Sequence, residues 1–536
     1  MLILGGKMFD FVRAGAAISL ALVPVPPALA QSGSSAPVVV TVDPSKPGSR
    51  IDRNIFGQFA EHLGTGIYGG VWVGEDSPIP NVRGIRKDVV AALRAIRVPN
   101  VRWPGGCFAD EYHWRHGIGP AKDRRVTINS NWGGSTEPNS FGTEEFMDFV
   151  DQIGSEAYVS VNVGSGTVAE AAEWIEYMTA DPATTAGKER AKNGRKAPYK
   201  VKYLGLGNES WACGGAMTPE HYTDVMKPFA RFVRNYNPAQ TGAEAMQRIA
   251  VGPSDDDPAY TDGVMKAWKS HDWSWNIEGL SLHHYTTGGW PPSYPSTGFD
   301  EGGYARLVKA TLGMDALIAK HSAIMDKYDP EKKVSLAVDE WGVWLAPTPG
   351  TNPGFLQQQN SMRDAIIAAL NLNIFARHGD RVRMTNIAQM ANVLQAMILT
   401  DGGKMVLTPT YHVFKMYLPF QDATLIPVRF DAATYSQGGI TLPRVDAVAV
   451  RDKAGQLWLA LTNLDPNRPV RIDAHFAGLQ VRAARGEVLT APRVDSNNSF
   501  EAPMTVVPKP FAAKAIKGGA QIELPGKSVA MLQIEE

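Results

Sequence analysis

The stretch V334-S-L-A-V-D-E-W-G-V-W344 decides how this chain of 536 residues is interpreted, because a buried strand in it ends in two acids. The apolar run 334–338 has the length and the β-branched content of a buried strand. Asp339 and Glu340 follow directly, and two tryptophans come next. Removing a carboxylate from water is costly unless partners hold its charge. Acids at such a position therefore indicate a functional site.

A second stretch, Y203-L-G-L-G-N-E-S-W211, repeats this pattern, with Glu209 at the end of a strand-like run. Working outward from both, we expect eight strands, at 55–59, 100–103, 157–162, 200–206, 249–252, 277–282, 334–338 and 381–385. Segments with apolar residues at three-to-four spacing lie between them, and we expect helices at 88–96, 144–153, 221–233 and 363–377. The polar, breaker-rich stretch 180–196 is expected to be a long exposed loop.

Strands that alternate with helices predict right-handed βαβ units and a parallel sheet. Eight such units predict an α/β fold, a closed (β/α)8 TIM barrel spanning 51–410. After about residue 411 the pattern changes to short alternating runs at 447–450, 457–461, 470–472, 521–524 and 528–534. Turn signals separate these runs, which predicts a C-terminal antiparallel β-sandwich, jelly-roll-like, over 411–536. A strand at 38–42, within the N-terminal segment 31–50, is expected to join that sandwich.

The first thirty residues have the layout of a secretory signal peptide. Lys7 and Arg13 flank the start, an apolar core covers 14–23, and A28-L-A30 offers small residues for cleavage. The apolar core is too short to cross a bilayer, so a membrane anchor is disfavoured. This pattern predicts export, to the periplasm or the medium, after removal of residues 1–30.

Composition excludes several classes of partner. The chain has 53 Lys+Arg against 54 Asp+Glu and no long basic run, which argues against nucleic acid. No later segment resembles a transmembrane helix. The chain has two cysteines, Cys107 and Cys213, so a disulfide scaffold is excluded, and a metal site built on cysteine would need further ligands. The two follow different strands, so a bridge stays open; we expect free thiols.

The carboxyl ends of barrel strands meet at one mouth, where the chemistry of this fold lies. Glu209 follows the fourth strand and Glu340 the seventh, so they face each other across that mouth. Hydrolysis of a glycoside needs such a pair, one as acid and one as nucleophile. Neighbouring tryptophans suit the apolar face of a sugar ring. Because side chains alternate along a strand, Asp339 is expected to be a structural neighbour rather than a second mouth residue.

Long stretches of the chain resemble glycoside hydrolase family 51, the α-L-arabinofuranosidases. The matching stretches are in the expected order and lie at 57–72, 102–120, 207–210, 339–344, 388–402 and 407–417. The resemblance implies that Glu209 is the general acid/base and Glu340 the nucleophile of a retaining double displacement. It implies carboxyl groups about 5 Å apart. The implied substrate is a terminal arabinofuranosyl residue of arabinoxylan, arabinan or their oligosaccharides, with no cofactor and no metal.

The resemblance also implies roles around the catalytic pair. Asn208 would bind the sugar 2-hydroxyl, while Arg102 and Tyr285 would hold the nucleophile ionised and oriented. The other positions implied to bind substrate are Glu61, Cys107, Trp132, His283 and Gln389. Many members of the family are oligomers, and this sequence fixes no number of subunits.

The sequence departs from the common family pattern in two loops. Gly342 stands where many members have Asn, and S210-W-A-C-G-G215 replaces a Met-Asp-Gly stretch. These loops shape the side where the leaving group binds, so the leaving-group preference stays open. The family also has members that act on other substrates, so another glycone, such as a xyloside, a galactofuranoside or a β-glucan, stays open as well. A non-catalytic carbohydrate-binding protein on a decayed barrel is a further alternative. That alternative predicts the loss of one carboxylate, and both are present.

Overall fold

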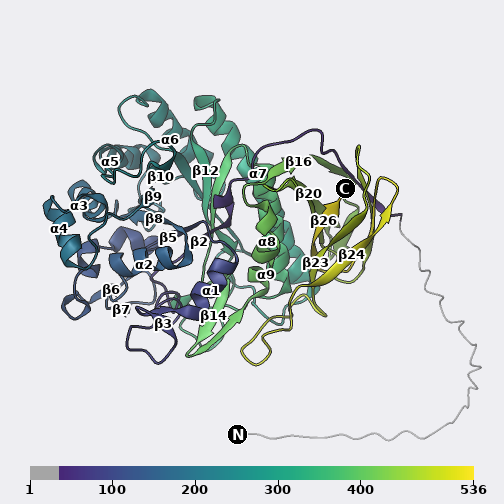
Figure 1. Cartoon of the computed structure of the whole chain (residues 1–536), viewed down its shortest axis with the longest axis horizontal. Coiled ribbons are helices and arrows are strands. Elements are labelled where there is room, and N and C mark those ends of the chain that lie inside the picture. Colours follow the sequence, from purple (N-terminus) through teal and green to yellow (C-terminus); the bar gives the residue numbers. More distant parts are fainter. Residues whose placement is uncertain (1–35) are drawn as a thin grey trace, which may run out of the picture. The chain divides into compact units, whose positions relative to one another are not determined.

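The computed structural model describes residues 36–536, of which residues 37–536 form one compact unit (Figure 1). The predicted signal peptide, residues 1–30, lies outside the described residues. Across residues 36–536, no helix has the length and apolar character that crossing a membrane requires. Because residues 37–536 cluster together, the predicted boundary between 410 and 411 stays a prediction.

Eight parallel strands close into a barrel in the order β10-β11-β12-β13-β2-β5-β8-β9, which confirms the predicted TIM barrel. Each lies at one of the eight predicted positions. Their bounds are β2 (Gly57–Phe59), β5 (Asn100–Trp103), β8 (Glu156–Val161), β9 (Val201–Leu206), β10 (Gln247–Ala250), β11 (Gly279–Thr286), β12 (Ser335–Val343) and β13 (Val382–Ile387). β9 and β12 are buried along their whole length, as expected for strands covered on both faces.

The helices follow the strands and include all four that the apolar spacing predicts. Those in residues 36–536 are α1 (Lys87–Ala95), α2 (Thr143–Ile153), α3 (Val168–Thr179), α4 (Thr185–Lys192), α5 (Pro219–Phe232), α6 (Pro258–Ser270), α7 (Glu301–Tyr328), α8 (Met362–Arg377) and α9 (Pro409–Met416). Several begin at a side-chain cap. Thr167 accepts from the N–H of Glu170, and Thr218 accepts from the N–H of His221. Such caps satisfy N–H groups that the helix leaves unpaired.

The expectation of a long loop at 180–196 is wrong, because α4 lies inside it. Thr184 caps this helix by accepting from the N–H of Gly187. The guanidinium of Arg190 is buried and donates to the backbone oxygens of Tyr177 at 2.6 Å and Ala180 at 2.8 Å. Tyr177 lies outside the segment 180–196 and Ala180 lies at its first position, so the polar composition alone did not reveal the helix.

Ten strands make the C-terminal sheet, in the order β16-β20-β21-β26-β23-β24-β25-β22-β1-β17. Their bounds are β1 (Val38–Val42), β16 (Thr424–Ile426), β17 (Val428–Phe430), β20 (Val445–Arg451), β21 (Leu457–Asn463), β22 (Val470–Phe476), β23 (Ala483–Thr490), β24 (Lys509–Ile516), β25 (Gly519–Leu524) and β26 (Ser528–Glu535). Buried side chains of β1, β21, β22 and β26 pack into one hydrophobic core, which includes Val40, Leu459, Ile472 and Leu532. The predicted strand at 38–42 joins this sheet and pairs with β22 in parallel, so the sheet is mostly rather than wholly antiparallel.

Helix α8 connects the barrel to the sheet. All its residues from Met362 to Ala376 are buried, and it contacts β12 on one side and β20, β21 and β26 on the other. A helix that is buried all round must satisfy its polar side chains internally. Asp446 of β20 accepts from Asn373 at 2.8 Å and from Arg377 at 3.0 Å, both on α8. This carboxylate therefore fixes α8 against the sheet.

We predict that Asp446→Ala lowers the stability of the fold by about 1–3 kcal/mol, because it leaves a buried amide and a guanidinium without their acceptor. The urea midpoint of unfolding measures this change. Asp224→Ala, which removes an exposed acid paired with Lys227, is the control and should leave the midpoint unchanged. An equal response of both variants would contradict a fixing role for Asp446.

Candidate active site

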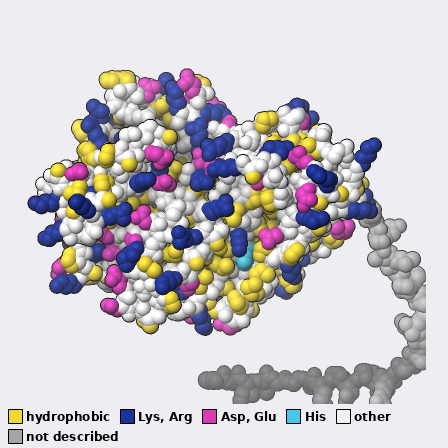
Figure 2. All heavy atoms as spheres, in the orientation of Figure 1, with side chains coloured by type: hydrophobic (Ala, Val, Ile, Leu, Met, Phe, Trp, Pro, Cys, Tyr) yellow, Lys and Arg dark blue, Asp and Glu magenta, His cyan; other side chains and the backbone are white. Residues whose placement is uncertain are grey.

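The predicted catalytic residues line a cavity of about 690 Å³ at the carboxyl ends of the barrel strands. Its walls are Cys107, Asn131, Trp132, Glu209, Trp211, Ala212, Cys213, Ser254, Asp255, His283, Tyr285, Thr287, Trp290, Glu340 and Trp344. Six of these are sequence-predicted site residues. The other four, Glu61, Arg102, Asn208 and Gln389, lie directly behind the lining. On the face that Figure 2 shows, acidic and basic side chains are interspersed, in keeping with a net charge of −1.

Glu340 is held from two sides. Arg102 donates from Nη1 to its Oε2 at 2.9 Å, and the Tyr285 hydroxyl donates to its Oε1 at 2.8 Å. The guanidinium of Arg102 also donates to Oδ1 of Asn208 at 2.5 Å and packs over the ring of Phe59. Both oxygens of Glu340 therefore have a donor, which stabilises the ionised carboxylate and fixes its direction.

Asp339 lies beneath the cavity rather than in its lining. Tyr158 donates to its Oδ2 at 2.6 Å, and Nε2 of His283 lies 3.2 Å from its Oδ1. Burial alone would raise the pKa of Asp339, but the charge of Arg102 and the contact with His283 outweigh it and lower that pKa. A register shift in the pairing of β12 with β13 falls between Val338 and Trp341, and it covers this acid pair. Asp339 is thus the buried neighbour that the alternation of the strand predicts.

Glu209 faces Glu340 across the cavity. One ligand atom each of Glu209, His283 and Glu340 lies within 4.8 Å of the others. Nδ1 of His283 lies 2.8 Å from Oε1 of Glu209, so a hydrogen bond joins the two side chains. Burial raises the pKa of Glu209, and the negative charge of Glu340 adds to that rise although His283 opposes it. Glu209 has a backbone φ of 37°, a left-handed conformation that is uncommon for a residue with a side chain and typical of functional sites.

His283 connects the two acids to Asp339. Burial alone would lower its pKa, but the charge of Glu340 and the contacts with Asp339 and Glu209 raise the pKa to about 10. A charged imidazolium at this point donates to Glu209 and balances two of the surrounding carboxylates. His283 therefore orients Glu209 within the cavity.

Glu61 anchors a second cluster behind the lining. Its Oε1 accepts from Nε1 of Trp132 and from the N–H of Gly106, both at 2.8 Å, and its Oε2 accepts from Gln389 at 2.9 Å. Burial and the charge of Glu340 raise the pKa of Glu61 to about 7. The glycine at 105 is required by this packing, since a Cβ there would lie 2.7 Å from Cγ of Glu61.

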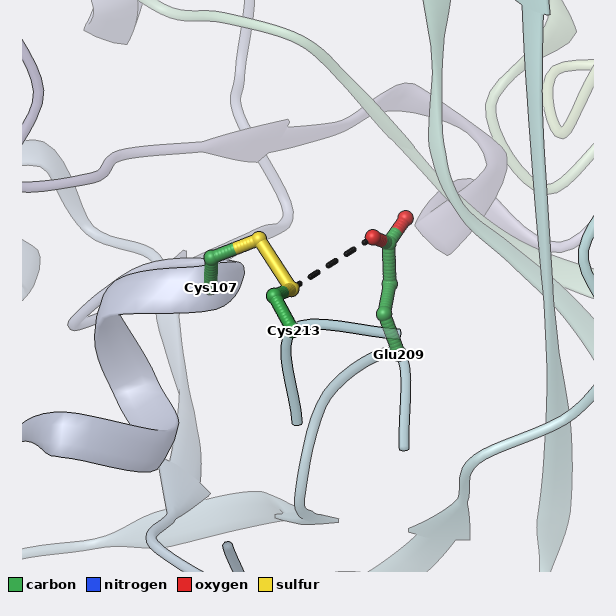
Figure 3. Close-up of side chains that lie close together, drawn as sticks. All are labelled: Cys107, Glu209 and Cys213. Carbon is green, nitrogen blue, oxygen red and sulfur yellow. Dashed lines mark hydrogen bonds between the residues drawn. A yellow bond between two sulfur atoms is a disulfide. The ribbon is translucent and has the colours of Figure 1, made fainter. Parts of the chain in front are cut away.

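The expectation of free thiols is wrong, because Cys107 and Cys213 form a disulfide with a Cα–Cα distance of 5.5 Å. The loops after β5 and β9 fold over the mouth and meet there, although the two cysteines are 106 positions apart in the sequence. Sγ of Cys213 lies 3.6 Å from Oε2 of Glu209, as Figure 3 shows. The disulfide is therefore part of the cavity wall, beside the predicted acid/base.

Sequence reasoning missed Asp110, which ties three loops together. Its carboxylate accepts from the N–H groups of Val163 at 2.8 Å, Gly164 at 2.9 Å and Asn208 at 2.7 Å. Burial raises its pKa to about 7, although these three hydrogen bonds favour the charged form. Asp110 stands in the stretch 102–120 that matches the family, so that match was the signal available for it.

Two family models match the chain. The α-L-arabinofuranosidase 1 domain matches residues 92–287, and the α-L-arabinofuranosidase C-terminal domain matches residues 339–528. An intracellular exo-α-L-arabinofuranosidase of Bacteroides ovatus is 47% identical over 504 residues, which are 94% of this chain and 96% of that protein. The chain belongs to glycoside hydrolase family 51. It is therefore a glycoside hydrolase of the α-L-arabinofuranosidase class.

Solved structures of family 51 share the whole architecture. A family 51 arabinofuranosidase from Xanthomonas axonopodis pv. citri is 52% identical, with a TM-score of 0.90, and the match covers 93% of this chain and 100% of that one. An α-L-arabinofuranosidase from Thermotoga maritima, solved as an arabinose complex, is 30% identical with a TM-score of 0.81 and the same coverage. The barrel and the C-terminal sheet are thus the fold of family 51 enzymes.

The prediction of export is wrong in the light of this comparison, since the Bacteroides relative is named intracellular. The prediction depended on basic, apolar and small residues within 1–30. Such a pattern is compositional, and composition alone does not establish that a segment is translocated or cleaved.

Two tryptophans of the opening stretch have different places in this family 51 enzyme. Trp341 is buried and packs against the rings of Phe375 and Phe414, so it belongs to the core. Trp344 lines the cavity beside Trp290, whose side chain is exposed. Trp290 was missed because its segment has no strand or helix pattern.

We predict that Glu61→Gln lowers kcat/KM of the family 51 enzyme roughly 30-fold, equivalent to about 2 kcal/mol. An amide has one acceptor oxygen, so its NH2 group would face an N–H donor where Glu61 now accepts. Steady-state kinetics on an aryl α-L-arabinofuranoside measure the change. Glu111→Gln is the control, because that carboxylate contacts Ser130 and is not part of the cavity lining. Unchanged kcat/KM in Glu61→Gln would contradict the role of this cluster.

Proposed function

We propose that this enzyme removes terminal, non-reducing α-L-arabinofuranosyl residues with retention of configuration. One observation carries the proposal: Glu209 and Glu340 present carboxylate oxygens within 4.8 Å of each other in one cavity. Retaining glycosidases hold their two carboxyl groups about 5 Å apart, whereas inverting ones need a wider gap for a water molecule. The narrow separation therefore supports a direct attack by one carboxylate.

In the first step Glu340 attacks the anomeric carbon, and Glu209 gives its proton to the leaving oxygen. The assignment follows from the surroundings of each acid. Arg102 and Tyr285 donate to both oxygens of Glu340, which suits an ionised nucleophile. Burial keeps the pKa of Glu209 raised, which suits a proton donor. Asn208, held by Arg102, is placed to bind the sugar 2-hydroxyl as charge develops.

In the second step water cleaves the arabinosyl ester of Glu340, with Glu209 as the base. Esterification removes the negative charge of Glu340, and that charge is one cause of the raised pKa of Glu209. The pKa of Glu209 therefore falls once the intermediate forms, so the same residue can accept a proton. The two steps use the two glutamates, the substrate and one water molecule.

The cavity itself supports an exo action on arabinose side chains. Trp132 lines one end of the cavity, and Glu61 and Gln389 lie directly behind it, a polar cluster suited to the hydroxyl groups of one furanose ring. Trp290 and Trp344 form an aromatic wall suited to the sugars of the leaving group. We propose arabinoxylan, arabinan or their oligosaccharides as substrates.

The roles of the two glutamates are tested by azide rescue of alanine variants. We predict that Glu209→Ala loses about 10²–10⁴-fold in rate on substrates with poor leaving groups. With an activated aryl substrate, for which breakdown of the intermediate limits the rate, azide restores turnover and gives the α-L-arabinofuranosyl azide, because the covalent intermediate still forms. Glu340→Ala should lose all turnover without azide and give the β-linked azide with it. Proton NMR of the products distinguishes the two. Turnover by Glu340→Ala without azide would contradict the assignment of Glu340 as the nucleophile.

The pH profile tests the protonation state of Glu209. Since the pKa of Glu209 is raised, the protonated acid persists toward neutral pH, and kcat/KM should fall as pH rises through that pKa. We predict that this alkaline fall disappears in Glu209→Ala when the leaving group is an activated phenol that needs no proton. An alkaline fall of equal size in the variant would mean that another group controls the profile.

A further inference from the structure

The disulfide of Cys107 and Cys213 lies in the cavity wall, and the catalytic mechanism does not use it. Sγ of Cys213 contacts Oε2 of Glu209 at 3.6 Å, while the other oxygen, Oε1, contacts His283. One ligand atom of each cysteine and of Glu209 lies within 4.8 Å of the other two. Figure 3 shows that the sulfur pair and the carboxylate point toward each other. Two sulfur atoms and one carboxylate are a donor set suited to zinc.

We propose that reduction of this disulfide creates an inhibitory Zn²⁺ site, formed by both cysteine sulfurs and the carboxylate of Glu209. The bound ion occupies the acid/base and stops hydrolysis. In the disulfide form the sulfurs are not thiolates and cannot bind zinc as anions, so that form resists the metal. The enzyme would therefore respond to zinc only under reducing conditions.

The geometry already approaches that of a zinc site. Zn–S bonds of about 2.3 Å and Zn–O bonds of about 2.0 Å at a tetrahedral centre place sulfur and oxygen about 3.5 Å apart. Cys213 and Glu209 are 3.6 Å apart at these atoms. Two sulfurs on one zinc lie about 3.8 Å apart by the same reasoning, so they must separate once the bond between them is cut. Rotation of two cysteine side chains supplies that movement without a change of fold.

The chemistry of the switch balances with a dithiol as reductant. The dithiol gives two electrons and two protons to the Cys107–Cys213 bond and becomes a disulfide itself, so both cysteines become thiols. Zinc then binds the two thiolates, and two protons are released. Compartments with high thiol content favour the reduced form of such pairs, and oxidising ones favour the disulfide.

The surroundings make the site accessible and orient its ligands. Cys107, Cys213 and Glu209 are all partly exposed and line the open cavity, so a small reductant and an ion can reach them. His283 holds the second oxygen of Glu209, and hydrogen bonds of this kind orient carboxylate ligands.

A second group of residues competes as a zinc site and must be distinguished. Glu209, His283 and Glu340 also bring ligand atoms within 4.8 Å of one another. There, however, Arg102 and Tyr285 already occupy both oxygens of Glu340, and the guanidinium charge opposes a cation. Zinc binding at that group would not depend on the redox state of the cysteines.

The test compares the oxidised and the reduced full-length enzyme. The protein is reduced with a dithiol under argon, freed of it by gel filtration, and checked by counting thiols with Ellman's reagent. Zn²⁺ is then titrated while bound metal and hydrolysis of an aryl α-L-arabinofuranoside are measured. We expect one tightly bound zinc per reduced chain, loss of activity in proportion to it, and recovery with EDTA. The oxidised enzyme should need at least about tenfold more zinc for the same loss.

Zinc binding by variants and the spectrum of bound Co²⁺ test the site without relying on enzyme activity. Cys213→Ser in reducing buffer should weaken zinc binding at least about tenfold, since a ligand is lost. Glu209→Gln should weaken it in the same direction while both thiols remain. Co²⁺ in place of zinc should give a thiolate charge-transfer band with the reduced wild type and lose it in Cys107→Ser/Cys213→Ser. The metal measurements do not depend on the proposed acid/base role, whereas the inhibition does.

Three outcomes would overturn the proposal. Equal zinc sensitivity of the oxidised and reduced enzymes would assign the ion to Glu209, His283 and Glu340 instead. Unchanged zinc affinity in Cys213→Ser would exclude the sulfurs as ligands. Zinc bound to the reduced enzyme without loss of activity would show that the ion does not reach the acid/base.

Discussion

One buried guanidinium holds the catalytic centre together. Arg102 is almost fully buried, donates to Glu340 and lies against Asp339, which is buried as well. Two carboxylates side by side in a protein interior would otherwise repel each other and protonate. The charge of Arg102 and the contacts of His283 with Asp339 and Glu340 let both acids remain in place. Removing one member of such a buried set leaves an uncompensated charge, which strongly destabilises the fold.

The rest of the fold serves to bring that set to one point. Its members come from the neighbouring strands β11 and β12 and from β5, which is distant in the chain and faces them because the barrel is closed. The loops above them are then fixed by a second group of contacts. Asp110 joins the loop after β5 to the ends of β8 and β9, and the disulfide joins it to the loop that carries Glu209. Glu209 has a left-handed backbone, a conformation that persists only where the surrounding structure holds it.

The sequence predicts those features that local chemistry determines. Each barrel strand is an apolar run bounded by turn residues, so the sequence predicts all eight. The active site of such a barrel lies at the carboxyl ends of its strands, and this rule singles out the acids there. Features that depend on distant partners were missed. Helix α4 exists because Arg190 finds carbonyl groups outside it, and Cys107 meets Cys213 only once the loops have folded. Asp110 appeared as one acid among many, because its three N–H partners belong to other segments.

Covalent labelling of the wild-type enzyme tests directly whether Glu340 is the nucleophile. An arabinofuranose-configured cyclitol epoxide or aziridine, which esterifies the nucleophile of a retaining enzyme, is incubated with the protein until activity is lost. Peptide mass spectrometry then locates the label. We predict one label per chain, on Glu340, with protection by arabinose. A label on Glu209, Asp339 or Glu61, or inactivation without a covalent adduct, would contradict it.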